Sequence, residues 1–275
     1  MTATTGTVGT SHGTIAYAQS REEGPAILLI HSNSSAKEVF ENQLAAPELD
    51  AWRVVAVDLP GHGDSQNAQD PEASYTFAGY AAMAEEVIER LELGVPVVVG
   101  WSLGGHIALE MAGRALAPLK GVMISGTPPV KPEMASLMAG FNINPDAENL
   151  TGKRDFTHED ALLYTTLTSG VDGWLDARFL DKCVRTDGRA REVMFGSVAA
   201  GNALDEREIV ASMSVPLAIV NGHDDVFIRA GYFDKLTYAT LWKHGVVRME
   251  GAAHAPFLQR PAAFNSLLAE FAANL

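Results

Sequence analysis

A serine between two glycines stands at the end of an apolar run. Gly100-Trp101-Ser102-Leu103-Gly104 matches the pattern G-x-S-x-G, in which a serine occupies a strained turn from a strand into a helix. Val95–Trp101 has the apolar character of a buried strand, and His106–Ala115 has a helical pattern. The glycines leave room for the turn, because side chains there would collide with the adjacent backbone. The pattern predicts that Ser102 is a nucleophile.

A serine hydroxyl is a poor nucleophile unless a base takes its proton. We assign the base to His254 in "EGAAHAPF", because this histidine follows the last predicted strand at the end of the sheet where ligands bind. Its position also gives the chain order serine, acid, histidine. We interpret the other seven histidines as structural or remote from the site: His12, His31, His62, His106, His158, His223 and His244.

The acid that orients the histidine is expected after the preceding strand. "IVNGHDDVF" offers Asp225, at the spacing Gly-x-x-Asp from Gly222, and its neighbour Asp224 as the alternative. "SGTPPV", which follows the sixth predicted strand, contains no carboxylate. We predict that Asp225 holds His254 in one tautomer and stabilises its imidazolium.

Attack of a serine on an ester carbonyl creates an oxyanion, which needs two aimed N–H donors. One donor is the backbone N–H of Leu103, directly after the nucleophile and at the start of a helix. We assign the second to the backbone N–H of Asn33, in the loop "HSNSSAKEVF" after the third predicted strand.

These residues require a sheet that brings the ends of its strands together. The segment "GTVGTSHGTIAYAQ" predicts two strands joined by a turn at residues 11–13. Uniformly apolar runs, typical of parallel strands buried on both faces, predict six more: Pro25–His31, Trp52–Gly63, Val95–Trp101, Leu119–Gly126, Val215–Gly222 and His244–Gly251. Helical patterns lie between the strands, at Ala36–Ala46, Thr76–Leu91, His106–Ala115 and Ala262–Asn274. This alternation predicts a mainly parallel eight-stranded α/β sheet flanked by helices.

One long segment interrupts the alternation. Residues 127–203 show short helical patterns, such as His158–Leu167 and Asp176–Val184, without a buried-strand pattern. We predict a helical cap insertion there, after the sixth strand, on a core formed by residues 1–126 and 204–275.

Composition restricts the class of protein. The formal net charge of −14 argues against nucleic-acid or anionic-membrane partners. Cys183 is the only cysteine, so no internal disulfide is possible, and no Cys/His spacing resembles a zinc site. Without a signal-peptide pattern or an apolar run of about 18 residues, we expect a cytoplasmic protein, either a monomer or a homodimer, that acts on a small molecule.

With these residues placed, the whole chain resembles the α/β-hydrolase fold. The motifs that carry the resemblance are "HSNSS", "DLPGHGDS", "GWSLGG", "NGHDDVF" and "GAAHAPF". Within that superfamily it is most similar to the serine-dependent N-acyl-homoserine-lactone lactonases, above all in the cap segment "RTDGRAREVMF" (Arg185–Phe195). There are two departures. Most relatives have His-Gly where this chain has His31-Ser32, and the close relatives can use glutamate where it has Asp225.

The resemblance implies a serine hydrolase of ester or lactone bonds that degrades a quorum signal without metal or cofactor. Tyr164, in a stretch that matches the lactonases, is our candidate donor to the oxygen of the lactone ring. Five more side chains are predicted to contact substrate: Trp101, Met138, Phe141, Trp174 and Phe227. Further apolar residues of the cap would line an acyl-chain pocket or form the core of the cap: Met134, Phe156 and Phe179.

Other functions remain open on the sequence alone. The same site would serve a carboxylesterase, an enol-lactonase or a carbon–carbon bond hydrolase, because a fold does not fix a substrate. A binding or sensor protein with slow turnover is a rival of a different class, against which the complete triad argues. A perhydrolase is a weaker option, suggested by the Ser-x-Gly-Gly sequence at Ser102.

Overall fold

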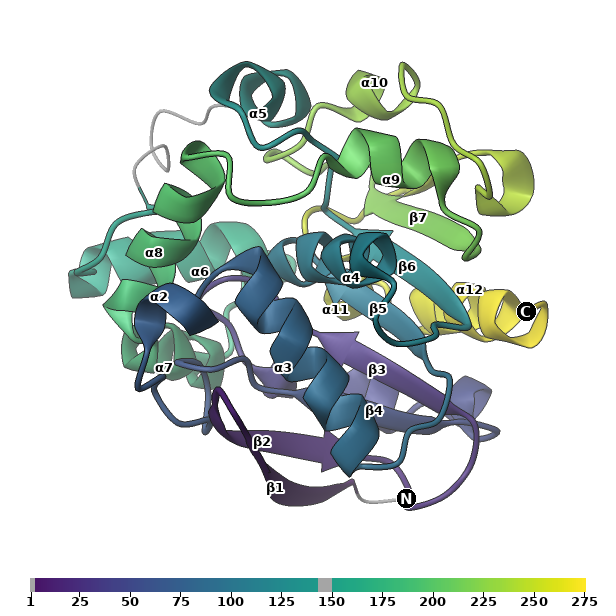
Figure 1. Ribbon diagram of the computed structural model, residues 1–275, viewed down its shortest axis with the longest axis horizontal. Coiled ribbons are helices and arrows are strands. Elements are labelled where there is room, and N and C mark those ends of the chain that lie inside the picture. Colours follow the sequence, from purple (N-terminus) through teal and green to yellow (C-terminus); the bar gives the residue numbers. More distant parts are fainter. Residues whose placement is uncertain (1–2, 143–149) are drawn as a thin grey trace.

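Eight strands form one sheet in the computed structural model, which describes residues 3–142 and 150–275 (Figure 1). Their spatial order is β1-β2-β4-β3-β5-β6-β7-β8, and only β2 runs antiparallel to its neighbours β1 and β4. The strands are β1 (Thr4–Thr10), β2 (Gly13–Gln19), β3 (Ala26–Ile30), β4 (Arg53–Val57), β5 (Val97–Trp101), β6 (Gly121–Ser125), β7 (Leu217–Gly222) and β8 (Val247–Met249). The predicted mainly parallel eight-stranded sheet is confirmed.

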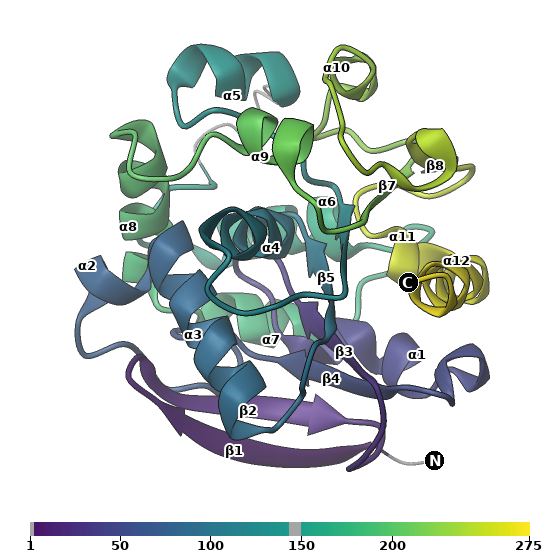
Figure 2. The same ribbon diagram turned by 45° about the vertical axis from the view of Figure 1, so that its right-hand side comes forward.

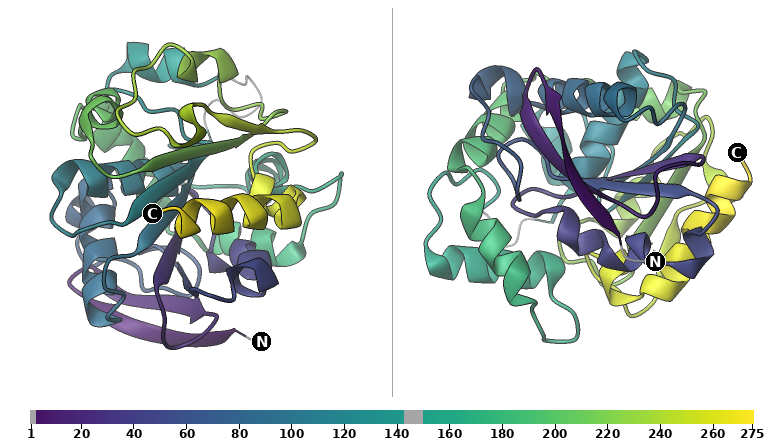
Figure 3. Two further views of the ribbon diagram at one scale, coloured as in Figure 1. Left: turned by 90° about the vertical axis from the view of Figure 1, so that its right-hand side faces the viewer. Right: turned by 90° about the horizontal axis from the view of Figure 1, so that it is seen from below.

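Burial explains the apolar strands. Every residue of β3, β5, β6 and β7 is buried, since helices cover both faces of the sheet there. The β1–β2 hairpin instead alternates in exposure and forms the edge of the sheet where the described chain begins (Figure 3). β6 and β7 pair in parallel, Val122 opposite Leu217, although the whole predicted insertion separates them in sequence.

Helices lie on both faces of the sheet (Figure 2). On one face are α3 (Phe77–Arg90), α4 (Leu103–Arg114) and α9 (Glu206–Ser212). On the other are α1 (Glu41–Leu44), the 3-10 turns Lys37–Phe40 and Pro47–Leu49, α11 (Pro256–Gln259) and α12 (Pro261–Ala273). In the part of the chain that the structure describes, no helix is both long enough and apolar enough to cross a bilayer.

Two predicted helices differ from the structure. The weak pattern at 36–46 forms a 3-10 turn and a four-residue helix instead of one continuous helix. α4 begins at Leu103 rather than at His106, because packing onto β5 and β6 overrides the poor helix propensity of Gly104 and Gly105. His106 Nδ1 lies 2.7 Å from Glu206 Oε1 on α9, a contact consistent with a structural role.

The predicted insertion is helical in its described residues; residues 143–149 lie outside them. It contains α5 (Met134–Gly140), α6 (His158–Ser169), α7 (Ala177–Arg185) and α8 (Gly188–Ala199). Figure 1 shows α6, α7 and α8 gathered beside α2 (Pro71–Ser74), whereas α5 lies apart from them, beside α10 (Ala230–Phe233). The insertion therefore covers the core with two groups of helices.

Charged side chains fix α7 to the core. Lys182 reaches Asp64 and Glu38, and Asp64 also accepts a hydrogen bond from the buried Lys37 ammonium at 2.7 Å. Arg185 donates to the main-chain oxygens of Gly61 and Ser65 and to Asn67 Oδ1. Arg178 forms a two-pronged ion pair with Glu41. This side of the insertion is bound to the loop after β4 and to α1.

Asp64→Asn is expected to weaken this attachment in a pH-dependent way. Hydrogen bonds from Lys182 and Lys37 lower the pKa of Asp64 to about 2, below the ~3.9 of an unfolded aspartate. The stabilisation is therefore fully present above about pH 4 and is lost as the pH falls through about 2. Since the Asp64 side chain is 58% exposed, we expect a loss below about 1 kcal/mol.

Urea unfolding at several pH values measures this effect. The matched control is Asp181→Asn, which removes the same charge from an exposed position on α7. A destabilisation by Asp64→Asn that is unchanged at pH 2 would contradict the electrostatic explanation.

Candidate active site

Ser102 lies at the turn between β5 and α4 in a strained backbone conformation. Its φ of 52° and ψ of −114° are unusual for a residue with a side chain, and its N–H donates to Ser125 O on β6 at 2.8 Å. The carbonyl of Ser102 accepts from Thr127 Oγ1 at 2.9 Å, so the turn is fixed on both sides of the serine. The serine is itself only half-buried. A strained residue held by several bonds is typical of a functional site.

The two glycines of the motif are required by close approach. A Cβ at Gly100 would lie 2.1 Å from Gly104 O, and a Cβ at Gly104 would lie 2.1 Å from Ile30 O at the end of β3. No side chain fits at either distance. The glycines therefore let α4 begin against the ends of β5 and β3, which brings its N-terminus beside the loop that starts at His31.

His254 and Asp225 form a buried pair. His254 Nδ1 lies 2.9 Å from Asp225 Oδ2, and the two side chains are 4% and 1% exposed. Asp225 Oδ1 accepts from the backbone N–H of Phe227 at 2.9 Å, so both carboxylate oxygens have partners. A carboxylate on Nδ1 leaves Nε2 of the imidazole as the nitrogen that can take a proton.

Asp224, the alternative acid, points elsewhere. Its carboxylate is 61% exposed and pairs with His223 Nδ1 at 3.0 Å, while its backbone N–H donates to Ala252 O. This geometry favours Asp225 as the acid.

Three groups contact the ring or the main chain of His254. The Phe227 ring centroid lies 4.6 Å from that of His254, and Trp101 Nε1 donates to His254 O at 2.8 Å. A Cβ on Gly126, just after β6, would lie 2.8 Å from His254 Cε1. Gly126 follows Ser125, the residue that anchors Ser102, so the imidazole is positioned beside the nucleophile turn.

The predicted oxyanion donors come from neighbouring elements. Leu103 is the first residue of α4, so its N–H has no acceptor within the helix. Asn33 is 4% exposed and follows β3, against whose last residue Gly104 packs. Its side-chain Nδ2 donates to Thr151 O at 3.1 Å. The side chain of Asn33 therefore has a structural partner of its own.

The His31-Ser32 sequence is accommodated in the core. Leu59 N donates to His31 Nε2 at 3.0 Å and His31 Nδ1 contacts Ser32 O at 2.7 Å, so the imidazole is neutral with its proton on Nδ1. Burial, the dominant cause, lowers the pKa of His31. Ser32 is 1% exposed and its hydroxyl is buried without a partner among the described residues. The additional hydroxymethyl group is thus enclosed directly before Asn33.

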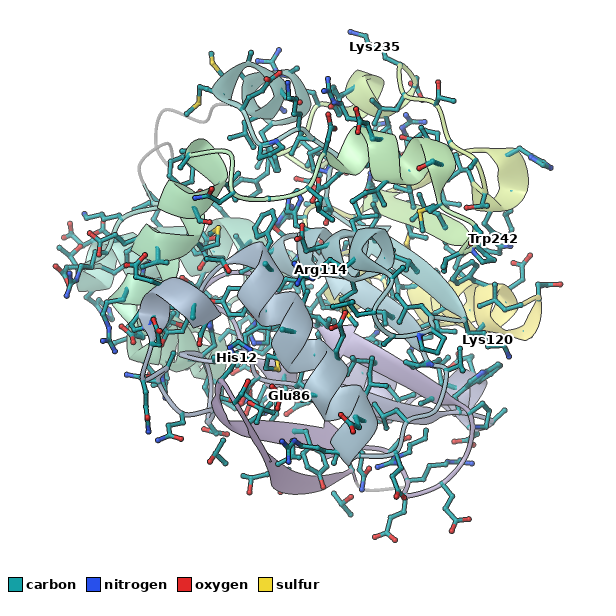
Figure 4. The ribbon with its side chains drawn as sticks, viewed as in Figure 1. His12, Glu86, Arg114, Lys120, Lys235 and Trp242 are labelled. Carbon is teal, nitrogen blue, oxygen red and sulfur yellow. The ribbon has the colours of Figure 1, made fainter. Side chains whose placement is uncertain are left out.

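The other histidines have separate environments. His12 lies at the β1–β2 turn, near Glu86 of α3 (Figure 4), and its Nδ1 contacts Ser74 Oγ at 3.0 Å. His62 is fully buried, with Nδ1 directed at Pro60 O, and burial lowers its pKa well below the usual value. Neither contacts the His254–Asp225 pair.

Tyr164 lies inside the insertion, beneath its surface. The residue is 6% exposed and clusters with Leu150, Ala161 and Cys183. Burial raises the pKa of its hydroxyl, and a hydrogen-bonding interaction with the Asn33 side chain acts in the opposite direction. The Tyr164 ring packs edge-on against that of Phe156, with the centroids 5.7 Å apart.

The remaining predicted substrate contacts differ in their surroundings. The Trp101 ring is 1% exposed and packs edge-on against Phe257 in the core, so we reassign Trp101 to the support of His254. The sequence did not reveal that Trp101 faces the core. A parallel strand is buried on both faces, so it has no alternation of polar and apolar residues that would show where each side chain points. Met138 and Trp174 are 47% and 65% exposed. Phe141 bridges to Ile228, next to Phe227.

Two further residues support the site without having been predicted. Thr127, in "SGTPPV", donates its hydroxyl to Ser102 O, and a Cβ on Gly105 would meet Thr127 Oγ1 at 2.1 Å. Gln259 joins the histidine loop to the insertion, since its Oε1 accepts from Ala253 N and its Nε2 donates to Gly170 O at 2.8 Å. The only signal for these residues in the sequence is a Thr or a Gln near the end of a predicted element, which does not indicate a role in the site.

Potential metal ligands do not gather anywhere in residues 3–142 and 150–275. No group of three or more His, Cys, Asp or Glu side chains is placed there to hold a metal ion.

Comparison with known proteins identifies similar chains. Two curated relatives are pimeloyl-[acyl-carrier protein] methyl ester esterases. That of Neisseria meningitidis serogroup A is 28% identical, covering 89% of this chain and 76% of the relative. That of Yersinia pseudotuberculosis is 30% identical, covering 80% and 83%.

Among solved structures, the N-acyl homoserine lactonase AidH in complex with N-butanoyl homoserine is 41% identical, with a TM-score of 0.92. The match covers 98% of this chain and 96% of that one. The predicted resemblance to these lactonases is confirmed. A family model described as the alpha/beta hydrolase family matches residues 27–267. This chain therefore belongs to the alpha/beta hydrolase family of enzymes.

Proposed function

We propose that this enzyme opens the lactone ring of N-acyl-homoserine lactones through a Ser102–His254–Asp225 triad. The observation that carries the proposal is the 41% identity to a homoserine lactonase over 98% of the chain, insertion included. Insertions above the site bind the variable part of a substrate, so similarity there is more informative than similarity in the core.

The first chemical step is acylation of the serine. His254 Nε2 accepts the Ser102 proton as Ser102 Oγ attacks the lactone carbonyl carbon. The carbonyl oxygen becomes an oxyanion, to which the N–H groups of Leu103 and Asn33 donate. Asp225 stabilises the imidazolium that has formed, through its 2.9 Å contact with Nδ1.

The second step breaks the ring. The carbonyl re-forms as the bond to the ring oxygen breaks, and His254 returns its proton to the departing alkoxide. That hydroxyl stays tethered to the acyl-enzyme and would close the ring again if it remained in place. Tyr164 is proposed to hold it by a hydrogen bond.

Water completes the cycle. His254 takes a proton from a water molecule, which attacks the acyl-enzyme carbonyl. As the second oxyanion collapses, the bond to Ser102 Oγ breaks and His254 returns the proton to Ser102 Oγ, which releases N-acyl-homoserine. One water is consumed for each lactone.

The acyl chain is proposed to follow the apolar surface between α5 and the loop after β7, which carries Asp225 and Phe227. Asn142 N donates to Phe227 O at 2.7 Å, which joins the end of α5 to the residue that stacks on His254. Phe141, Met138 and Phe227 would contact the chain, with Trp174 on a more exposed part of the insertion. Apolar side chains beside a triad favour a substrate with a hydrocarbon tail.

A carboxylesterase acting on a linear ester is the second candidate. The 28–30% identity to methyl ester esterases favours it, and the triad chemistry would be the same. The two differ in the leaving group, which is free in a linear ester and tethered in a lactone.

A substrate panel separates these candidates. We expect mass detection to find the product of N-acyl-homoserine lactone plus one water, with kcat/KM at least about tenfold above that for methyl pimelate or an aryl ester of equal chain length. The Ser102→Ala protein is the background control. Turnover of the linear esters alone would refute the lactonase proposal.

Activity is also expected to survive exhaustive chelation, whereas loss with EDTA and rescue by zinc would overturn a triad mechanism without metal.

A further inference from the structure

Arg191 on α8 is a charged side chain buried within the insertion. The residue is 2% exposed, and its guanidinium carbon lies 3.8 Å from the centroid of the Phe156 ring. Burial is the main cause that lowers its pKa. A buried arginine loses its hydration and is retained only where hydrogen bonds replace it. Its partners therefore indicate what it holds.

Two of its hydrogen bonds fix the segment before α6. Nε donates to Lys153 O and Nη2 donates to Arg154 O, both at 2.7 Å. These short bonds and the stacking on Phe156 position a stretch that begins just after Thr151. The Phe156 ring in turn packs edge-on against Tyr164, with the centroids 5.7 Å apart.

The third hydrogen bond crosses from the insertion to the core. Arg191 Nη1 donates to Ser34 Oγ at 3.0 Å, and Ser34 Oγ donates to Asn33 Oδ1 at 3.2 Å. Asn33 Nδ2 then donates to Thr151 O at 3.1 Å, which returns to the segment that Arg191 holds. These contacts form a closed hydrogen-bond network around Asn33.

This hydrogen-bond network holds the backbone at residues 33 and 34, which is in a strained conformation. Ser34 has a φ of 54°, a conformation that a residue with a side chain adopts at a cost. The direction of the Asn33 N–H depends on the conformation of this loop. Donors to an oxyanion must be in place before the reaction, since misplacement by about 1 Å can cost about 100-fold in rate.

We propose that Arg191 is a positioning residue that fixes the Asn33 loop for oxyanion binding and sets the place of Tyr164 beside it. The inference rests on the proposed triad mechanism. It goes beyond that mechanism because it states that a residue of the insertion, Arg191, affects the rate of the chemical step. Ester substrates that need no ring opening depend on Arg191 in the same way, since they form the same oxyanion.

Arg191→Met is expected to lower kcat by about 10- to 100-fold while KM changes less than about threefold. The rate at which a fluorophosphonate labels Ser102 should fall in parallel, because its phosphoryl oxygen uses the same donors. Arg191→Lys keeps the charge without the planar fork and should recover only part of the rate. The matched control is Arg154→Met, whose guanidinium is half exposed and pairs with Glu192.

Ser34→Ala tests the link without disturbing the insertion. It removes only the hydroxyl between Arg191 and Asn33, so it should lower kcat by about three- to tenfold and leave the thermal unfolding midpoint close to the wild-type value. If both residues act through one contact, the double variant should be little worse than Arg191→Met alone. If Arg191→Met fails to fold, the kcat and labelling rate of Ser34→Ala alone still test the link.

Two results would overturn the inference. One is a rise in KM with unchanged kcat and labelling rate, which would make Arg191 a substrate-binding residue. The other is either full activity of a folded Ser34→Ala protein, or a loss in Ser34→Ala that adds fully to that of Arg191→Met in the double variant. All kinetics are measured on an aryl ester as well as a lactone. A wrong lactone substrate is therefore recognised separately, and the aryl ester still tests the role of Arg191.

Discussion

Ser102→Ala is expected to lower kcat/KM for lactone opening by about 10⁴-fold or more, because the remaining donors and the binding surface provide only residual catalysis. Fluorophosphonate labelling should disappear completely. The fold should persist, since the hydrogen bonds that hold the turn are made by the backbone N–H and carbonyl of Ser102. Alanine also tolerates the local φ about as well as serine does.

Circular dichroism and thermal unfolding provide the control for Ser102→Ala. A folded variant with more than about a tenth of the wild-type rate would reject Ser102 as the nucleophile. A wild-type protein that is never labelled would favour a binding or sensor protein with slow turnover.

Asp225→Asn is the second change with a large expected effect, about 10⁴-fold in kcat near neutral pH. An amide cannot stabilise the imidazolium, and its NH₂ group can favour the wrong tautomer of His254. Phe227 N can still bond the amide oxygen, so the loop should keep its shape. The ratio of kcat values for wild type and variant, measured on one lactone and one aryl ester, gives the size of the effect.

The chain provides a closely matched control in Asp224→Asn. This neighbour carries the same charge on the same loop but pairs with His223 at the surface, so we expect less than about a twofold change. The reverse result, a severe loss with Asp224→Asn and a mild one with Asp225→Asn, would assign the acid to Asp224.

The sequence predicted the sheet, and it also led to the proposed triad positions, because each of these residues follows an apolar strand. Strand ends converge in a parallel sheet, so Ser102, Asp225 and His254 could be grouped without coordinates. It could not decide between Asp224 and Asp225, since adjacent loop residues have no periodicity that tells which side chain turns inward. The contact between Asp225 and His254 Nδ1 favours Asp225 as the proposed acid.

Arg191 shows why the support of the site escaped prediction. An arginine in a helical pattern usually indicates an exposed face. Its burial depends on the backbone of residues 153 and 154 folding over it, a contact between segments that are separated in sequence by the whole of α6 and α7. Trp101 is the opposite case. An aromatic side chain next to Ser102 suggested a substrate contact, but its ring packs in the core.

The pairing of β6 with β7 has a consequence for the length of the segment inserted between them. Val122 meets Leu217 across the entire insertion, so folding must close a long loop before this pair forms. The entropy of loop closure grows only with the logarithm of loop length, and doubling a loop costs only about 0.6 kcal/mol more. The free energy of forming the β6–β7 pair therefore depends only weakly on how many residues are inserted between these strands. Inserted segments of different length can thus be accommodated at this junction while β6 and β7 keep their register.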